Sequence, residues 1–253
     1  IARGIEVELL DFGKSAPIDL NRVEAALRAD RGQAIKAVLV THVDTSSSVK
    51  ADIPALRAVL DLVGHPALLA VDGIASMGCD AMRMEEWGVD LIVGASQKGL
   101  MVPPGLGLIW ASERAVQRCA DSDLRTPYWD WRPRFGAAEF WQHWGGTAPT
   151  HHLFGLRESL DMIFEEGLPS VWARHATLAR TVWAAFDAWG AGHPAIALNV
   201  ADPAHRGHAV TAARIGPAPN ATRLRAWTEA QAGVTLGIGL GMAAPGDPAG
   251  DAY

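Results

Sequence analysis

The sequence predicts an α/β fold: a mostly parallel sheet with helices on both faces, followed by part of a smaller α+β domain. Two observations predict this class. Short apolar runs alternate with amphipathic helical patterns through the first half of the chain, which is the order that βαβ units produce. The 253 residues, 49% hydrophobic and 20% charged, are also enough to bury a sizeable core.

The first half contains the strands and helices that define this sheet. Apolar runs predict strands at residues 5–10, 35–41, 67–71, 89–93 and 107–111. Apolar residues recurring at helical spacing predict helices at 19–28 and 52–62. Asp52 is placed to cap the second helix, and Pro54 lies in its first turn.

The second half has a different composition. Residues 126–146 are rich in Trp, Pro and Gly and predict an ordered loop with a short helix. The remaining pattern predicts helices at 150–166, 170–189 and 222–232 and strands at 195–200 and 209–215. Gly167 closes the first of these helices, and we expect a domain boundary there, between a large domain at 1–166 and a small one at 167–253.

Charge and cysteine content limit the class of protein. A net charge of −6 argues against a nucleic-acid-binding surface, and the absence of an 18-residue apolar run argues against a membrane span. Cys79 and Cys119 lack metal-ligand spacing, so we expect reduced thiols, no metal site and a cytoplasmic location. The chain starts at Ile1 and stops at Tyr253 after a Gly/Pro-rich stretch, so both ends look cut from a longer chain.

A carboxylate and an amine follow two neighbouring predicted strands. Asp72 comes directly after the run at 67–71, and Lys98 lies just past the run at 89–93. Strands of a doubly wound sheet end on the ligand side, so both side chains are expected to face one crevice. A lysine that forms a Schiff base and an aspartate that pairs with a pyridinium nitrogen are what pyridoxal phosphate (PLP) needs from a protein. Each residue alone has an ordinary alternative, a solvated lysine or a turn-capping aspartate.

Two groups of hydroxyls can bind a phosphate. Thr45 begins a run of four hydroxyl residues after the strand at 35–41, which suits a phosphate or a phenolate oxygen; a polar turn is the alternative. Thr147 precedes the helix at 150–166. A helix N-terminus with a free hydroxyl suits a phosphate, and a plain capping residue is the alternative.

Several motifs together resemble the class V aminotransferases, especially the serine–glyoxylate and alanine–glyoxylate branch. They are VDGIAS at 71–76, RMEEWGVD at 83–90 and GASQKGLMVPPGL at 94–106, with further likeness at 147–149, 156–160, 165–168, 172–175 and 237–241. The 26-residue separation of Asp72 and Lys98 agrees with the family pattern.

The resemblance implies a fold-type-I PLP enzyme and a homodimer with active sites at the subunit interface. It implies that Lys98 holds the cofactor covalently and acts as the general base. The other implied cofactor contacts are Asp72 at the pyridinium nitrogen, Ile74 against a ring face, Thr45 near the ring hydroxyl, Gln97 at the phosphate, and Thr147 at the phosphate of the neighbouring subunit's cofactor.

The implied reaction moves an amino group from a small L-amino acid (serine, alanine or aspartate) to a 2-oxo acid such as glyoxylate, with ping-pong kinetics. Two alternatives remain: a PLP-dependent lyase or desulfurase of the same class, and a truncated, non-catalytic remnant. Ser47 and Ser48 stand where the family usually has Thr-Gly, and Trp144 where it often has Tyr. The family's phosphate loop and ring-stacking aromatic correspond to positions before Ile1, and its substrate-carboxylate arginine to a position after Tyr253.

Overall fold

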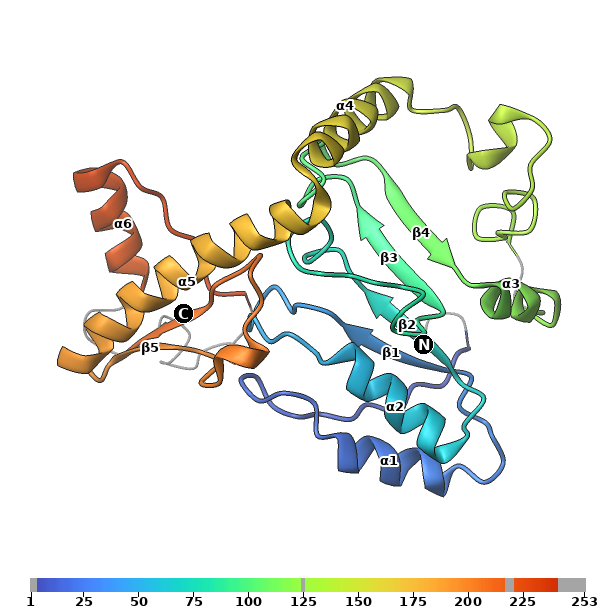
Figure 1. The fold of residues 1–253 in the computed structure, drawn as a ribbon, viewed down its shortest axis with the longest axis horizontal. Helices are drawn as coiled ribbons and strands as arrows, with labels where there is room; N and C mark the ends of the chain where they lie inside the picture. The colour runs from blue at the N-terminus through green and yellow to red at the C-terminus, as the bar shows by residue number, and fades with distance from the viewer. Residues whose placement is uncertain (1–3, 124–125, 217–220, 241–253) are drawn as a thin grey trace.

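The main sheet has four strands in the order β1-β2-β3-β4 (Figure 1). The structure is a computed structural model that describes residues 4–123, 126–216 and 221–240, so Ile1, Gly241 and Tyr253 lie outside the described residues. The strands are β1 (Ala37–Thr41), β2 (Leu68–Asp72), β3 (Leu91–Ala95) and β4 (Gly107–Ala111). β1, β2 and β3 are parallel and β4 runs antiparallel to β3, which confirms the predicted mostly parallel sheet.

Two helices of the first half begin where the sequence predicts. In α1 (Leu20–Ala29), the Asp19 carboxylate accepts hydrogen bonds from the first-turn N–H groups. In α2 (Ile53–Val63), the Asp52 carboxylate accepts from the Ala55 N–H at 3.0 Å. α2 ends at Gly64, whose left-handed φ of 67° suits glycine. These caps satisfy backbone donors that have no partner inside the helix.

The main core lies between the sheet and this helix pair. It is formed by buried apolar residues from α1, α2 and the inward face of the strands, chiefly Val23, Leu27, Ile53, Leu56, Leu60, Leu69, Val71 and Ile92. Alternate strand residues point to the other face, where Leu39 is 77% exposed and Val93 and Ile109 are also exposed. α1 and α2 therefore cover one face of the sheet.

Two local predictions need correction. Residues 5–10 form no strand, and their alternating side chains, including Leu9, are largely exposed. Apolar and charged residues do alternate in this segment, but no described strand lies beside it to form the hydrogen bonds of a β-sheet. The structure also contains a short polar helix that was not predicted, α3 (Glu113–Ala120). The Ser112 hydroxyl caps its start by accepting a hydrogen bond from the Ala115 N–H.

The second half is helical with a small second sheet. The loop at 126–146 contains a short 3-10 helix (Phe140–His143), as predicted. α4 (Thr150–Glu166) and α5 (Leu168–Gly192) meet at Gly167, and α6 spans Ala221–Ala232. The division into domains at 1–166 and 167–253 stays a prediction. Among the described residues, no helix combines the length and the hydrophobicity that a membrane span requires.

The predicted strands at 195–200 and 209–215 are shorter than expected. Only β5 (Ile196–Leu198) and β6 (Ala213–Ile215) pair, antiparallel to each other. Residues 199–212 between them, which include the 3-10 turn Pro203–His205, dock instead on the loop that follows β1. Tertiary contacts with the first half therefore override the apolar pattern of this segment.

Candidate active site around Lys98

The carboxyl ends of the parallel strands bring three predicted site residues to one edge of the sheet. Asp72 is the last residue of β2 and pairs in register with Val93 of β3. Lys98 lies in the turn that leaves β3, and Thr45 lies in the loop after β1. This is the edge at which open α/β sheets bind their ligands.

The Lys98 turn is held by hydrogen bonds to a fully buried serine. The Ser96 hydroxyl donates to the Pro103 carbonyl at 2.8 Å and accepts from the Leu106 N–H at 3.3 Å. The Met101 N–H donates to the Lys98 carbonyl at 2.9 Å. The Lys98 side chain is exposed, and no hydrogen bond or ion pair of its amine occurs in the described part of the chain. The turn is therefore held by hydrogen bonds, while the Lys98 amine has no hydrogen-bond or ion-pair partner among the described residues.

Two glycines allow the loop after β2 to pack backbone-to-backbone against the Lys98 turn. A Cβ at Gly99 would lie 2.2 Å from the Met77 carbonyl oxygen. A Cβ at Gly78, where φ is +84°, would lie 2.8 Å from the Gly99 carbonyl oxygen. The contact fixes the segment that follows Asp72 against the segment that carries Lys98.

We therefore predict that Gly99→Ala destabilises the protein by about 1–3 kcal/mol, the usual cost of overpacking. The measurement is chemical unfolding of the variant against wild type. Gly107→Ala is the matched control, since a Cβ there meets nothing within 4 Å. Equal stability of the Gly99→Ala variant and wild type would show that the two loops separate freely.

Asp72 presents its carboxylate at the strand end. One oxygen accepts a hydrogen bond from the Ile74 N–H at 2.9 Å, which closes a tight turn after β2. The residue is exposed, so its charge is accessible to a ligand at this edge. Its backbone carbonyl accepts from the His42 N–H at 2.9 Å, which ties the strand end to the loop after β1.

Lys98 and Thr45 line a cavity of about 440 Å³ between the sheet edge and the second half of the chain. The other lining residues are Ala75, Cys79, Gly99, Met101, Met162, Ile163, Glu166, Val171, Arg174, His175, Ala209 and Val210. The remaining predicted site residues do not line it: Asp72 and Gln97 are exposed nearby, Ile74 is half-buried beside Ala75, and Thr147 is exposed in the loop before α4.

The polar groups of the cavity include a guanidinium–carboxylate pair. Arg174 Nε and Nη2 donate to the two Glu166 carboxylate oxygens, each at 2.8 Å. Burial, reinforced by the Asp80 charge, raises the pKa of the Cys79 thiol to about 11. Burial and the neighbouring Arg174 lower the pKa of His175. At neutral pH the thiol and the imidazole are therefore both uncharged.

Sequence reasoning gave no role to Glu166, Arg174, His175, Ala209 or Val210. The first three lie within motifs that carried the family resemblance, but their spacing from Lys98 gives no hint that they share its cavity. They meet Lys98 because α4 and α5 cross the sheet edge and the 199–212 segment folds back (Figure 1). Such long-range packing has no local sequence signal.

The residues present fit PLP. The cofactor needs an amine that can bond covalently, a carboxylate for its ring nitrogen and donors for its oxygens. Lys98 and Thr45 supply an amine and a hydroxyl in a cavity whose volume lies in the ordinary range for small-molecule sites. The Asp72 carboxylate ends β2 at the same edge of the sheet, outside the lining of this cavity.

The fold is that of the fold-type-I PLP-dependent enzymes. The crystal structure of pyridoxamine–pyruvate aminotransferase from Mesorhizobium loti matches with a TM-score of 0.76 at 28% identity, covering 89% of this chain and 56% of that one. A model of the family "Aminotransferase class-V" matches residues 1–227. The chain belongs to the class V aminotransferase family.

Two similar proteins have named activities. L-aspartate–glyoxylate aminotransferase of Paracoccus denitrificans is 37% identical over 95% of this chain and 59% of its own length. Serine–glyoxylate aminotransferase of Arabidopsis thaliana is 39% identical over 74% of this chain and 46% of its own length. The chain thus spans about half the length of these relatives.

Proposed function

We propose that the protein is a PLP-dependent aminotransferase that moves an amino group from a small L-amino acid to a 2-oxo acid such as glyoxylate. The observation that carries the proposal is the uncommitted amine of Lys98 in a cavity at the strand edge where Asp72 ends β2. The activities of the similar proteins support the choice of glyoxylate as acceptor.

Lys98 has two roles in this proposal. Its amine would hold the cofactor covalently, and as a free amine it would act as the general base that takes and gives back the Cα proton of the amino donor. When bound, PLP supplies an electron sink for the charge that develops at Cα. The Lys98 turn, anchored by Ser96, keeps the amine in place for both tasks.

The remaining predicted residues hold the cofactor. The Asp72 carboxylate would accept a hydrogen bond from the ring nitrogen and Ile74 would contact a ring face. Thr45 would hydrogen-bond near the ring hydroxyl, and Gln97 would contact the phosphate. The ordered turns around these residues support the assignment, because a cofactor site needs side chains held on a rigid frame.

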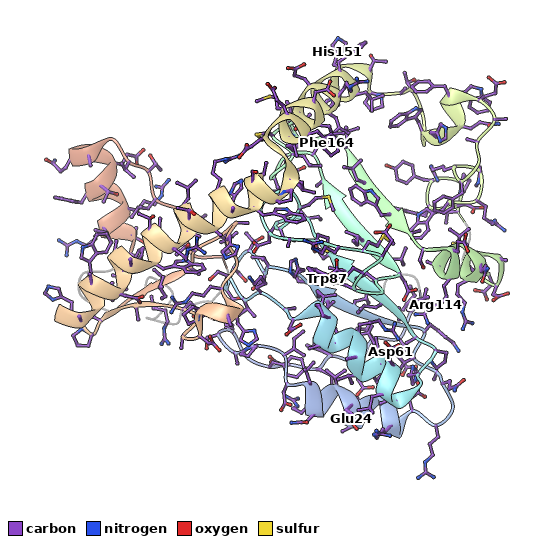
Figure 2. All side chains as sticks on the ribbon, in the orientation of Figure 1. Glu24, Asp61, Trp87, Arg114, His151 and Phe164 are labelled. Atoms are coloured by element: carbon purple, nitrogen blue, oxygen red, sulfur yellow. The ribbon has the colours of Figure 1, made fainter. Side chains whose placement is uncertain are left out.

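A homodimer is part of the proposal. Thr147 does not line the Lys98 cavity and is exposed, as expected of a residue that reaches a neighbouring subunit's cofactor. Large aromatic side chains before and along α4 are also exposed, including Trp141, Phe154 and Phe164; His151 and Phe164 mark the two ends of α4 in Figure 2. Exposed apolar groups of this kind are typical of interfaces.

Two further observations bear on the remaining expectations. Cys79 is buried with a raised pKa, so it does not suit the reactive thiolate that a desulfurase uses. Both cysteines are free thiols, which supports the expectation of a reducing compartment, the cytoplasm.

The test is a transamination assay on the full-length protein loaded with PLP. Serine, alanine and aspartate are offered separately with glyoxylate, and glycine formation is measured. We expect glycine with at least one donor, with ping-pong kinetics. Release of sulfide or of an eliminated side chain without glycine would support the lyase or desulfurase alternative, and no cofactor binding would support the remnant.

We predict that Asp72→Asn weakens PLP binding by roughly 10–100-fold, because the neutral amide no longer favours a protonated ring nitrogen. The measurement is a cofactor titration of PLP-free protein. Asp61→Asn is the control: Asp61 projects from α2 (Figure 2), is 66% exposed and pairs with Arg57. Unchanged affinity of the Asp72 variant would remove this residue from the site.

A further inference from the structure

Asp80 carries a buried carboxylate next to the Lys98 cavity, since it directly follows the lining residue Cys79 in the chain. Its side chain is 2% exposed. The His208 N–H donates to one carboxylate oxygen at 2.9 Å, and His208 Nδ1 donates to the other at 2.8 Å. The Lys50 ammonium lies 3.6 Å away. A buried carboxylate is stable only when it is paired in this way, so the contacts form a specific anchor for residue 208.

Asp80 is ionised at neutral pH. Burial raises its pKa, but the hydrogen bonds from His208 and the charges of His208 and Lys50 outweigh burial and hold the pKa below the usual aspartate value. The ring of His208 also stacks on Trp183 of α5 at 5.7 Å between centroids. The imidazole is therefore fixed on both sides.

The anchor secures a segment that also docks on the cofactor side of the sheet. Within residues 199–212, the Gly207 N–H donates to the Ser48 carbonyl at 2.9 Å. Ser48 belongs to the loop after β1, whose Thr45 lines the Lys98 cavity. The segment is thus joined to the loop after β1 by backbone contacts and to the loop after β2 by the hydrogen bonds between His208 and the buried Asp80.

The sequence neighbours of the pair form walls of the cavity. Neither Asp80 nor His208 lines it, but the residue before the first and the two residues after the second do: Cys79, Ala209 and Val210. Movement of His208 therefore moves two wall residues directly.

We propose that Asp80 is a positioning residue that, through its two hydrogen bonds with His208, sets the place of the Ala209–Val210 wall and so the size of amino donor that the Lys98 cavity admits. The second half of this statement rests on the proposed function. The first half concerns the wall alone and is testable without any reaction.

The first test measures access to the cavity through the Cys79 thiol. Iodoacetamide alkylation is followed by peptide mass spectrometry in the full-length protein, with and without PLP. The decisive variant is His208→Gln, which keeps the Asp80 charge beside Cys79 and so does not favour the thiolate. We expect about tenfold faster alkylation of Cys79, as for a local opening. Cys119 on α3 serves as an internal control, and Asp61→Asn as a control variant.

The second test separates binding from turnover. In the PLP-loaded enzyme, His208→Gln and Asp80→Asn are expected to change the KM of amino donors about tenfold while kcat stays within about threefold, since only the wall and not Lys98 has moved. Donors of different side-chain size should be affected unequally. The double variant should be no worse than either single variant, because both remove one interaction.

An unchanged Cys79 rate in His208→Gln would overturn the proposal, and so would an equal rise at Cys79 and Cys119, which would mean general loosening. Equal KM changes for all donors would overturn the assignment of donor size. If Cys79 responds as expected but wild type transfers no amino group, the anchor stands and the proposed function fails.

Discussion

Replacing Lys98 with alanine in the full-length protein is expected to reduce transamination by about 10³-fold or more, because the variant loses both the covalent link to the cofactor and the general base. Lys98 is exposed and uncommitted in the structure, so its removal breaks no described contact. The fold should therefore be retained. The measurement is kcat/KM for the best amino donor, with unfolding curves to verify stability.

Lys98→Arg is the matched variant for this prediction. It keeps a positive charge but not an amine that can form the bond or take a proton at neutral pH. We expect the arginine variant to be as inactive as the alanine variant. A small amine added to the assay should restore part of the activity of the alanine variant but not of the arginine variant. Wild-type activity in either variant would refute the assigned role of Lys98.

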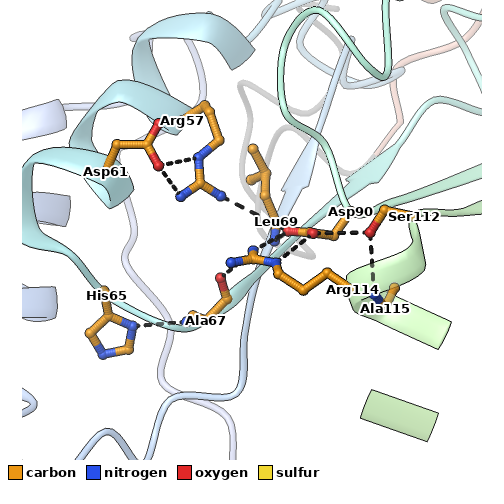
Figure 3. A network of polar contacts seen from close by, with 9 residues as sticks. All are labelled: Arg57, Asp61, His65, Ala67, Leu69, Asp90, Ser112, Arg114 and Ala115. Atoms are coloured by element: carbon orange, nitrogen blue, oxygen red, sulfur yellow. Dashed lines mark hydrogen bonds and ion pairs between the residues drawn. The ribbon is translucent and has the colours of Figure 1, made fainter. Parts of the chain in front are cut away.

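The largest stability effect is expected at Asp90, at the opposite edge of the sheet from Lys98. Its carboxylate accepts from Arg114 Nε at 2.8 Å, from the Leu69 N–H at 2.8 Å and from the Ser112 hydroxyl at 3.1 Å (Figure 3). The side chain is 6% exposed. Asp90→Ala leaves these donors without a partner and should lower the free energy of unfolding by about 3 kcal/mol.

The effect of Asp90→Ala should depend on pH in one direction. Burial raises the pKa of Asp90, but the hydrogen bonds from Arg114 and the Leu69 N–H lower this pKa by a larger amount. The pKa of Asp90 therefore lies below the usual aspartate value. A depressed folded-state pKa contributes stability above the unfolded value, about 4, and loses it as pH falls toward the folded value. The difference between wild type and variant, measured by urea unfolding, should shrink below about pH 4.

Asp61→Ala provides the control for Asp90. Both carboxylates face Arg57 (Figure 3), but Asp61 is 66% exposed. Its removal should change stability by no more than about 0.5 kcal/mol. If the two variants were equally stable, the Asp90 contacts would contribute nothing beyond an exposed ion pair.

Local signals explain what the sequence predicts well. The N-cap Asp52, the left-handed Gly64 and the apolar runs of β1 to β4 each act within a few residues, so the elements around the sheet form where expected. The run at 5–10 has the same local signal without a partner strand among the described residues, and the prediction was wrong there. Strand pairing is a property of two segments, and one segment cannot reveal it.

The residues of the candidate site likewise include some that local sequence signals predict and some that depend on long-range packing. Asp72 and Lys98 come to one edge because parallel strands impose it, and the sequence is enough to predict that. The Asp80–His208 anchor and the meeting of Ala209 with Lys98 in one cavity depend on how the 199–212 segment folds back on the first half of the chain. Those contacts join residues up to 128 positions apart, which no periodicity encodes.

The most direct test of the account is to identify the lysine that bonds the cofactor. The full-length protein loaded with PLP is reduced with borohydride, digested and analysed by mass spectrometry. We expect a phosphopyridoxyl group on the peptide that contains Lys98. The same group on another lysine, or on none, would contradict it.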